Sequence, residues 1–184
     1  MEIIKTKIPG LLVIRPKVFE DSRGYFFESY NESKFLDNNI NMRFVQDNES
    51  KSQYGVIRAL HYQLAPYAQT KLVRVVVGKV FDVAVDIRKG SPTFGQWEGI
   101  ELSGENKTQL LIPKGCAHGF VVLSESAIFS YKCDEVYNKQ AERGIKYNDP
   151  EISVDWKIDL SKAIISERDK NLPSFKDAEY NFIF

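Results

Sequence analysis

The chain has 184 residues, and its 25 Lys and Arg residues are balanced by 25 Asp and Glu residues. This length predicts one domain over residues 1–184 with a sizeable apolar core. Zero net charge argues against binding nucleic acid or an anionic membrane through bulk charge. No apolar run is long enough to span a bilayer, and the charged N-terminus is unlike a signal peptide. Two cysteines without metal-binding spacing favour a reducing cytoplasm.

The first half of the chain predicts short strands separated by turns. An apolar run at 11–16 forms a strand, and a turn at 22–24 precedes an aromatic-rich strand. Residues 31–39 predict one or two helical turns with Asn31 as the N-cap. Further strands are expected at 42–50, 55–63, 71–77 and 80–87, with a turn at Gly78-Lys79 joining the last two.

Two of these strands carry ionisable residues among apolar ones. In 80–87, alternation places Phe81, Val83, Val85 and Ile87 on one face and Asp82, Ala84 and Asp86 on the other. Strand 71–77 is uniformly polar on neither face, so we expect it to be covered on both sides. Ionisable groups in such strands must be exposed, be paired or line a polar cavity.

In the second half, strands are expected at 98–102 and 107–112, followed by a pair at 117–123 and 127–133. From residue 138 the chain is polar and irregular, and it ends in a short helix at SERDKN and an extended tail. About ten short strands without a long helix predict an all-β sandwich or barrel.

The candidate catalytic residues each have a structural alternative. His61 and His118 suit general base chemistry near neutral pH, but lone strand histidines are more often structural. Tyr131 can pack inward or serve as a general acid, and Tyr137, just past a strand, can stack on a planar ring or cover the core. Two histidines on separate strands also leave open a metal site completed by carboxylates.

Three cations could bind an anion or remain solvated: Lys71, Arg58 and Arg23. Strict alternation places Arg58 and His61 on opposite faces of their strand. If both serve one site, the strand must contain a bulge or end between them.

Together, several motifs resemble the dTDP-4-dehydrorhamnose 3,5-epimerases over nearly the whole chain and in that family's order. They are DSRGYFFESYN, FVQDNES, GVIRALHYQ, KLVRVVVGKVFDVAVDIRKGSPTFGQW, LIPKGCAHGF, YKCDEVY, AERGIKYNDPEISVDW and ISERD. The resemblance implies a cupin-type jelly roll (a double-stranded β-helix) with short peripheral helices. It also implies a homodimer that uses no metal and no other cofactor.

By the same resemblance, His61 is the catalytic base, Asp169 orients it, Tyr131 is the catalytic tyrosine and Lys71 lies near the keto oxygen of the sugar. Tyr137 matches the residue that stacks on thymine. The other positions implied to bind the dTDP-sugar are Arg23, Glu28, Gln46, Asn48, Arg58, His118, Glu142 and Arg168. Ala59 and Thr70 stand where glycine is common in the family, and Arg168 stands where lysine is frequent.

The implied activity inverts C3 and C5 of dTDP-4-dehydro-6-deoxy-D-glucose, by proton abstraction beside the ketone and reprotonation from the opposite face. One alternative is an epimerase that inverts a single carbon or acts on another nucleotide sugar. A second is a jelly-roll module that binds sugar nucleotides without catalysis. A third is a metal-dependent cupin oxygenase or isomerase.

Overall fold

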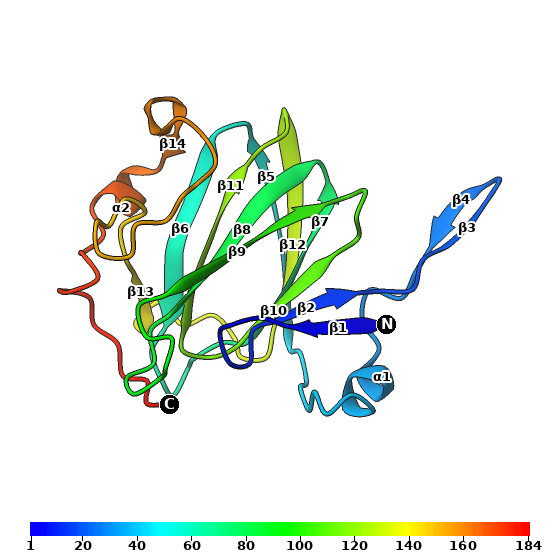
Figure 1. Cartoon of the computed structure of the whole chain (residues 1–184), viewed down its shortest axis with the longest axis horizontal. Helices are drawn as coiled ribbons and strands as arrows, with labels where there is room; N and C mark the ends of the chain where they lie inside the picture. The colour runs from blue at the N-terminus through cyan, green and yellow to red at the C-terminus, as the bar shows by residue number, and fades with distance from the viewer.

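The structure is a computed structural model that describes all residues from 1 to 184, and two antiparallel sheets face each other in it (Figure 1). The first sheet has the spatial order β1-β2-β10-β7-β12-β5. Its strands are β1 (Glu2–Lys5), β2 (Leu12–Arg15), β5 (Gln46–Gln53), β7 (Lys71–Val77), β10 (Gln109–Ile112) and β12 (Ser126–Cys133).

The second sheet has the order β13-β6-β11-β8-β9, with β14 added in parallel to β6. Its strands are β6 (Val56–Gln63), β8 (Lys79–Asp86), β9 (Trp97–Ser103), β11 (Cys116–Val122), β13 (Glu142–Gly144) and β14 (Ile164–Ile165). A separate hairpin of β3 (Phe19–Asp21) and β4 (Gly24–Phe26) projects from the body (Figure 1).

Helices are few and short: α1 (Glu32–Leu36), a 3₁₀ turn (Leu160–Lys162) and α2 (Glu167–Lys170). The predicted cap is confirmed, because the Asn31 side chain accepts a hydrogen bond from the Lys34 backbone N–H. The short helix predicted in SERDKN is α2, which Ser166 caps in the same way. No helix has the length and apolar character needed to cross a membrane.

Consecutive strands mostly alternate between the two sheets, which confirms the predicted jelly roll. The turn after β7 is therefore no hairpin turn: Gly78, at φ +80°, carries the chain from one sheet to the other. A Cβ at Gly78 would lie 2.0 Å from the Ser126 carbonyl oxygen, so the crossing requires glycine. The predicted pairing of 117–123 with 127–133 is wrong for the same reason, since β11 and β12 belong to different sheets.

The predicted strand at 42–50 is shifted, because β5 begins only at Gln46 and runs to Gln53. Met42 and Phe44 instead pack with Phe35 of α1 on the outer face of the first sheet. The strands β1, β3, β13 and β14 were not predicted. They have only two to four residues each, too few for side-chain alternation to be recognised.

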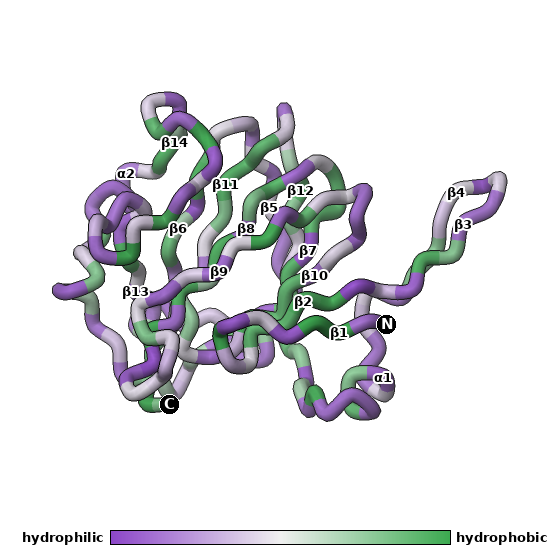
Figure 2. The backbone as a smooth tube through the Cα atoms, viewed as in Figure 1, coloured by the Kyte–Doolittle hydropathy of each residue, from purple (hydrophilic) through white to green (hydrophobic).

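Besides the cluster around Phe35, apolar side chains form two layers. The first lies between the sheets and includes Val73, Phe120 and Phe129. The second lies on the outer face of the second sheet, where Phe81, Val83, Val85 and Ile87 pack, as predicted, with residues of the C-terminal segment such as Trp156, Phe175 and Phe182. Figure 2 shows this pattern as hydrophobic stretches along β8 and β11 and hydrophilic ones around α2 and the tip of the β3–β4 hairpin.

Candidate functional site

Strand β6 contains the irregularity that a shared site of Arg58 and His61 requires. Against β11, Phe120 pairs with Arg58 and His118 pairs with His61. Between these two pairs β6 advances by three residues while β11 advances by two. The extra residue is a β-bulge, and both Ala59 and Leu60 within it are fully buried. Arg58 and His61 consequently line the same hollow, which has a volume of about 360 Å³.

Asp169 reaches His61 along the edge of β6 that faces away from β11. Strand β13 covers the end of β6 that contains His61 and Gln63, whereas β14 covers the end that contains Val56 and Ile57. Helix α2 follows directly after β14 and contributes Asp169, which is buried. The Asp169 Oδ1 lies 2.8 Å from the His61 Nε2.

The His61–Asp169 pair has the properties of a base and its orienting acid. Burial alone would raise the pKa of Asp169, but hydrogen bonds from His61, from the Ala59 backbone N–H and from Ser166 hold that pKa below its usual range. The carboxylate is therefore ionised near neutral pH and fixes the imidazole through Nε2. The Nδ1 of His61 makes no hydrogen bond within the chain and is free to accept a proton.

Lys71 and Tyr131 enter the interior from the opposite sheet, on β7 and β12. The Lys71 Nζ lies 6.0 Å from the centre of the Tyr131 ring. Burial lowers the pKa of the Lys71 ammonium and raises the pKa of the Tyr131 phenol. At neutral pH the phenol keeps its proton, so Tyr131 is able to donate it.

His118 lies beside these groups on β11 and is paired with Asp82 of β8. Its Nε2 is 3.0 and 3.1 Å from the two carboxylate oxygens of Asp82, and both residues are buried. Burial lowers the pKa of His118 and raises the pKa of Asp82, so burial disfavours the charged form of each group while the two share a hydrogen bond through Nε2. This pair fixes the ring orientation of His118 within the interior.

A second polar cluster lies at the β13 end of the site. The Tyr137 hydroxyl donates to the Glu142 Oε2 at 2.6 Å, and an Arg168 guanidinium nitrogen is 2.7 Å from the same oxygen. Burial would raise the pKa of Glu142, but the hydrogen bonds from Arg168 and Tyr137 lower it. Glu142 thereby links Tyr137 to Arg168, the residue next to Asp169.

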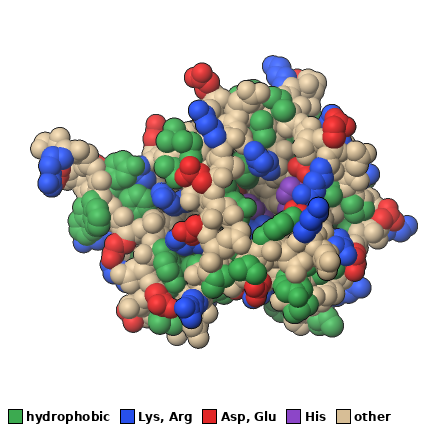
Figure 3. Space-filling view, turned by 180° about the vertical axis from the view of Figure 1, so that it is seen from behind, with side chains coloured by type: hydrophobic (Ala, Val, Ile, Leu, Met, Phe, Trp, Pro, Cys, Tyr) green, Lys and Arg blue, Asp and Glu red, His purple; other side chains and the backbone are tan.

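The remaining predicted positions on the edge strand β5 are connected to this cluster. The Gln46 Nε2 donates to the Asn48 Oδ1 at 2.9 Å, and the Gln46 Oε1 accepts from the Tyr137 backbone N–H at 2.8 Å. At the other end, the Arg58 Nε donates to the Ser52 Oγ at 3.1 Å, and Arg58 has no carboxylate partner. Figure 3 shows a histidine inside a hollow on this side of the molecule, with Lys and Arg side chains around its rim.

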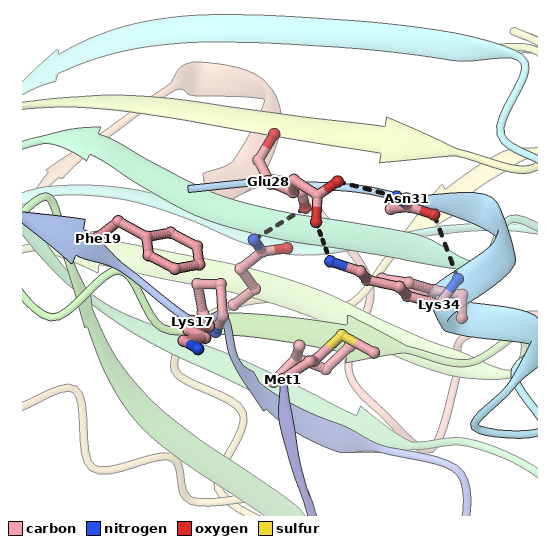
Figure 4. A pocket seen from close by; sticks show the side chains of 11 residues that line it. Met1, Lys17, Phe19, Glu28, Asn31 and Lys34 are labelled. Carbon is pink, nitrogen blue, oxygen red and sulfur yellow. Dashed lines mark hydrogen bonds and ion pairs between the residues drawn. The ribbon is translucent and has the colours of Figure 1, made fainter. Parts of the chain in front are cut away.

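Two predicted substrate-binding residues lie elsewhere in the chain. Arg23 is exposed near the tip of the β3–β4 hairpin, where it pairs with Asp21 at 2.6 Å. Glu28 lines a separate small hollow beside α1 and is bound by Asn31 and Lys34 (Figure 4). Within one chain, neither side chain lines the hollow of His61.

Sequence reasoning missed two polar residues of the interior, Asp82 and Gln63. Asp82 could have been found, because a carboxylate in a strand whose other face is apolar must be exposed, paired or line a cavity. No sequence signal singles out Gln63, since its role depends on loops that alternation does not predict. Nowhere in the chain do three or more His, Cys, Asp or Glu side chains form a group suited to a metal ion.

The chain is similar to known proteins over nearly its whole length. A family model described as dTDP-4-dehydrorhamnose 3,5-epimerase matches residues 5–177. The dTDP-4-dehydrorhamnose 3,5-epimerase of Shigella flexneri is 55% identical over 181 residues, which cover 98% of this chain and 99% of that protein.

Solved structures are equally similar. The dTDP-4-dehydrorhamnose 3,5-epimerase of Elizabethkingia anophelis matches with a TM-score of 0.92 and 56% identity, covering 96% of this chain and 97% of that one. The dTDP-6-deoxy-D-glucose-3,5-epimerase of Legionella pneumophila, in complex with dTDP-4-keto-L-rhamnose, matches with a TM-score of 0.92 and 50% identity. That match covers 96% of this chain and 93% of the Legionella chain.

Proposed function

The chain belongs to the dTDP-4-dehydrorhamnose 3,5-epimerase family, and from this premise we propose how its site carries out the reaction. The enzyme inverts C3 and C5 of dTDP-4-dehydro-6-deoxy-D-glucose to give dTDP-4-dehydro-L-rhamnose, a step in dTDP-rhamnose biosynthesis. The observation that carries the mechanism is the placement of two proton-transfer groups on facing sheets, His61 on β6 and Tyr131 on β12.

A hydrogen on a carbon beside a ketone is weakly acidic, because its removal gives an enolate. The free Nδ1 of His61 takes this proton, and Asp169 holds the ring in place and stabilises the imidazolium that forms. Tyr131 then delivers a proton to the other face of the sugar ring, which inverts the carbon. Repetition at the second carbon, on the other side of the C4 ketone, completes the double inversion.

Lys71 stabilises the charge that develops on the C4 oxygen. Its ammonium lies beside Tyr131 in a buried interior, where a cation interacts more strongly with an enolate than it would in water. Arg58, which has no carboxylate partner, binds the diphosphate. His118, Gln46, Asn48, Glu142 and Arg168 surround the remaining polar groups of the substrate, and no step requires a metal or other cofactor.

The proposed function is tested by incubating chelator-treated protein with dTDP-4-dehydro-6-deoxy-D-glucose in deuterated water. We expect deuterium at both C3 and C5, together with the rhamnose configuration of the product, as measured by NMR. Deuterium at one carbon only would identify a single-carbon epimerase. Binding without any exchange would indicate a non-catalytic module, and activity restored only by a divalent ion would indicate a metal enzyme.

Tyr137 provides the stacking surface for thymine, because its ring is half exposed beside the hollow. Tyr137→Ala is expected to weaken substrate binding by about 1–3 kcal/mol, the range measured for stacked nucleic-acid bases. The turnover number at saturating substrate should change little, as steady-state kinetics will show. A large fall in turnover with unchanged binding would contradict this role.

The enzyme acts as a homodimer in which the projecting hairpin contacts the second copy. Phe19, Tyr25 and Phe26 of this hairpin are more than half exposed, and apolar surface of this kind favours association. The same contact would give Arg23 a substrate to bind on the partner. Sedimentation should show a dimer for the wild type and a monomer for Phe26→Ser, and a monomeric wild type would refute the proposal.

A further inference from the structure

The loop that carries Tyr137 is attached to the sheets in an unusual way. Residues 135–137, just after β12, form no backbone-to-backbone hydrogen bond with any other residue. Their main-chain groups are bound by side chains instead. The loop's position therefore depends on those side chains and not on a strand ladder.

Three glutamines provide the attachment. The Gln69 Nε2 donates to the Glu135 carbonyl oxygen at 2.8 Å. The Gln46 Oε1 accepts from the Tyr137 N–H at 2.8 Å. Gln63 binds on both sides of Tyr137: its Nε2 donates to the Val136 carbonyl oxygen at 3.2 Å, and its Oε1 accepts from the Asn138 N–H at 2.7 Å.

Gln63 is the most constrained of the three. It is 4% exposed, and it is the last residue of β6, two residues after His61. Its second Nε2 hydrogen is donated to the Tyr67 carbonyl oxygen at 2.7 Å, so the amide has partners on both its nitrogen and its oxygen. A buried amide whose donors are all used fixes the groups that it binds, because breaking any of these bonds leaves a buried polar group unpaired.

We propose that Gln63 is a positioning residue for nucleotide binding, which holds Tyr137 in the orientation that accepts the base. This proposal rests on the proposed function, since it assumes that the group stacked on Tyr137 is the thymine of the substrate. Gln63 acts through the backbone on either side of Tyr137 and does not touch the base itself. Fixing the ring before the nucleotide arrives removes the ordering cost that a mobile loop would impose on binding.

The test replaces Gln63 by Met, which has a similar length and no amide. Gln63→Met should raise the KM for the nucleotide sugar and the Kd for dTDP by about tenfold, while kcat changes by less than about twofold. The Kd for inorganic pyrophosphate, which has no base to stack, should stay the same. Gln140→Met is the matched control, because the Gln140 side chain lies in the same loop, is exposed and makes no hydrogen bond.

A double-mutant cycle separates positioning from a general structural effect. In a Tyr137→Ala background, Gln63→Met should add almost nothing to the Kd for dTDP. An equal increase in both backgrounds, or an unchanged Kd in Gln63→Met alone, would overturn the proposal. If Gln63→Met does not fold, as circular dichroism will show, Gln69→Met makes the same comparison with one bond lost. The dTDP measurements need no turnover, so an inactive wild type would refute the epimerase reaction and leave this test intact.

Discussion

His61→Ala should cause both solvent exchange and epimerisation to collapse, whereas Tyr131→Phe should sharply reduce inversion and keep part of the exchange. Without His61 no group remains to remove the proton, so no enolate forms. Tyr131→Phe keeps the ring and its packing against Phe129 but deletes the hydroxyl. The enolate can then still form, and His61 returns a proton to the face from which it was taken.

The size of the effect follows from the loss of one general acid or base, about 10²–10⁴-fold in rate. Deuterium incorporation and product configuration are measured on the same samples, and circular dichroism confirms that both variants fold. The proton on His61 must exchange with water before it returns, so exchange in Tyr131→Phe will be partial. Equal loss of exchange and inversion in Tyr131→Phe would leave its role as the acid unsupported, and full inversion would make Tyr131 a packing residue.

Lys71→Met should lower kcat by about 10²–10³-fold, the usual effect of removing one group that stabilises a developing oxyanion. The wild-type pH profile should also carry the signature of Lys71. Only the charged ammonium stabilises the enolate, and that charge is lost as pH rises through the lysine pKa. Because burial lowers this pKa from its ordinary value of 10.5, the alkaline decline in kcat should begin below that pH.

Ionisation of Tyr131 does not explain this alkaline decline in kcat, since burial raises the pKa of the phenol and Tyr131 keeps its proton to higher pH. Lys71→Arg retains a charge that does not titrate in this range, so its alkaline decline should move to higher pH. The exposed Lys139→Met serves as the control for loss of a lysine. An identical alkaline decline in Lys71→Met would show that another group causes it.

The strands whose side chains alternate regularly could be predicted from the sequence, together with the face on which each side chain lies. In β8, Phe81, Val83 and Val85 pack on one face and Asp82 lies on the other, as alternation requires. In β6 strict alternation does not hold between Arg58 and His61, because the bulge at Ala59 and Leu60 puts both side chains on the same face. The requirement for a bulge followed from the residues, but its position depends on pairing with β11.

Ala59 illustrates the same dependence on a neighbouring strand. A Cβ on Gly119 of β11 would lie 2.6 Å from the Cβ of Ala59, so the two strands approach closely at the bulge. A Cβ at 119 would also lie 2.7 Å from the Arg58 carbonyl oxygen, so the close approach of the two strands requires glycine at 119. A single sequence without its strand pairings contains no sign of this requirement.

Other parts of the site were beyond local sequence reasoning. Asp169 reaches His61 across 108 positions of sequence, through a gap between two strands that have only three and two residues. Its role came from the resemblance to the family and not from periodicity. The sheet membership of β11 and β12 was likewise mispredicted, because a short polar connection serves a hairpin and a crossing between sheets equally well.

The C-terminal segment gives the enzyme an unequal distribution of stability. Its apolar side chains pack on the outside of the second sheet, and it delivers Asp169 over the edge of β6. If this segment detaches, the second sheet loses β14 while the other strand ladders remain, and His61 loses its contact with the Asp169 carboxylate. Partial opening of this kind requires less free energy than global unfolding. In the proposed mechanism, catalysis therefore requires that residues 145–184 stay docked, and a protein that keeps nearly all of its strands can already be inactive.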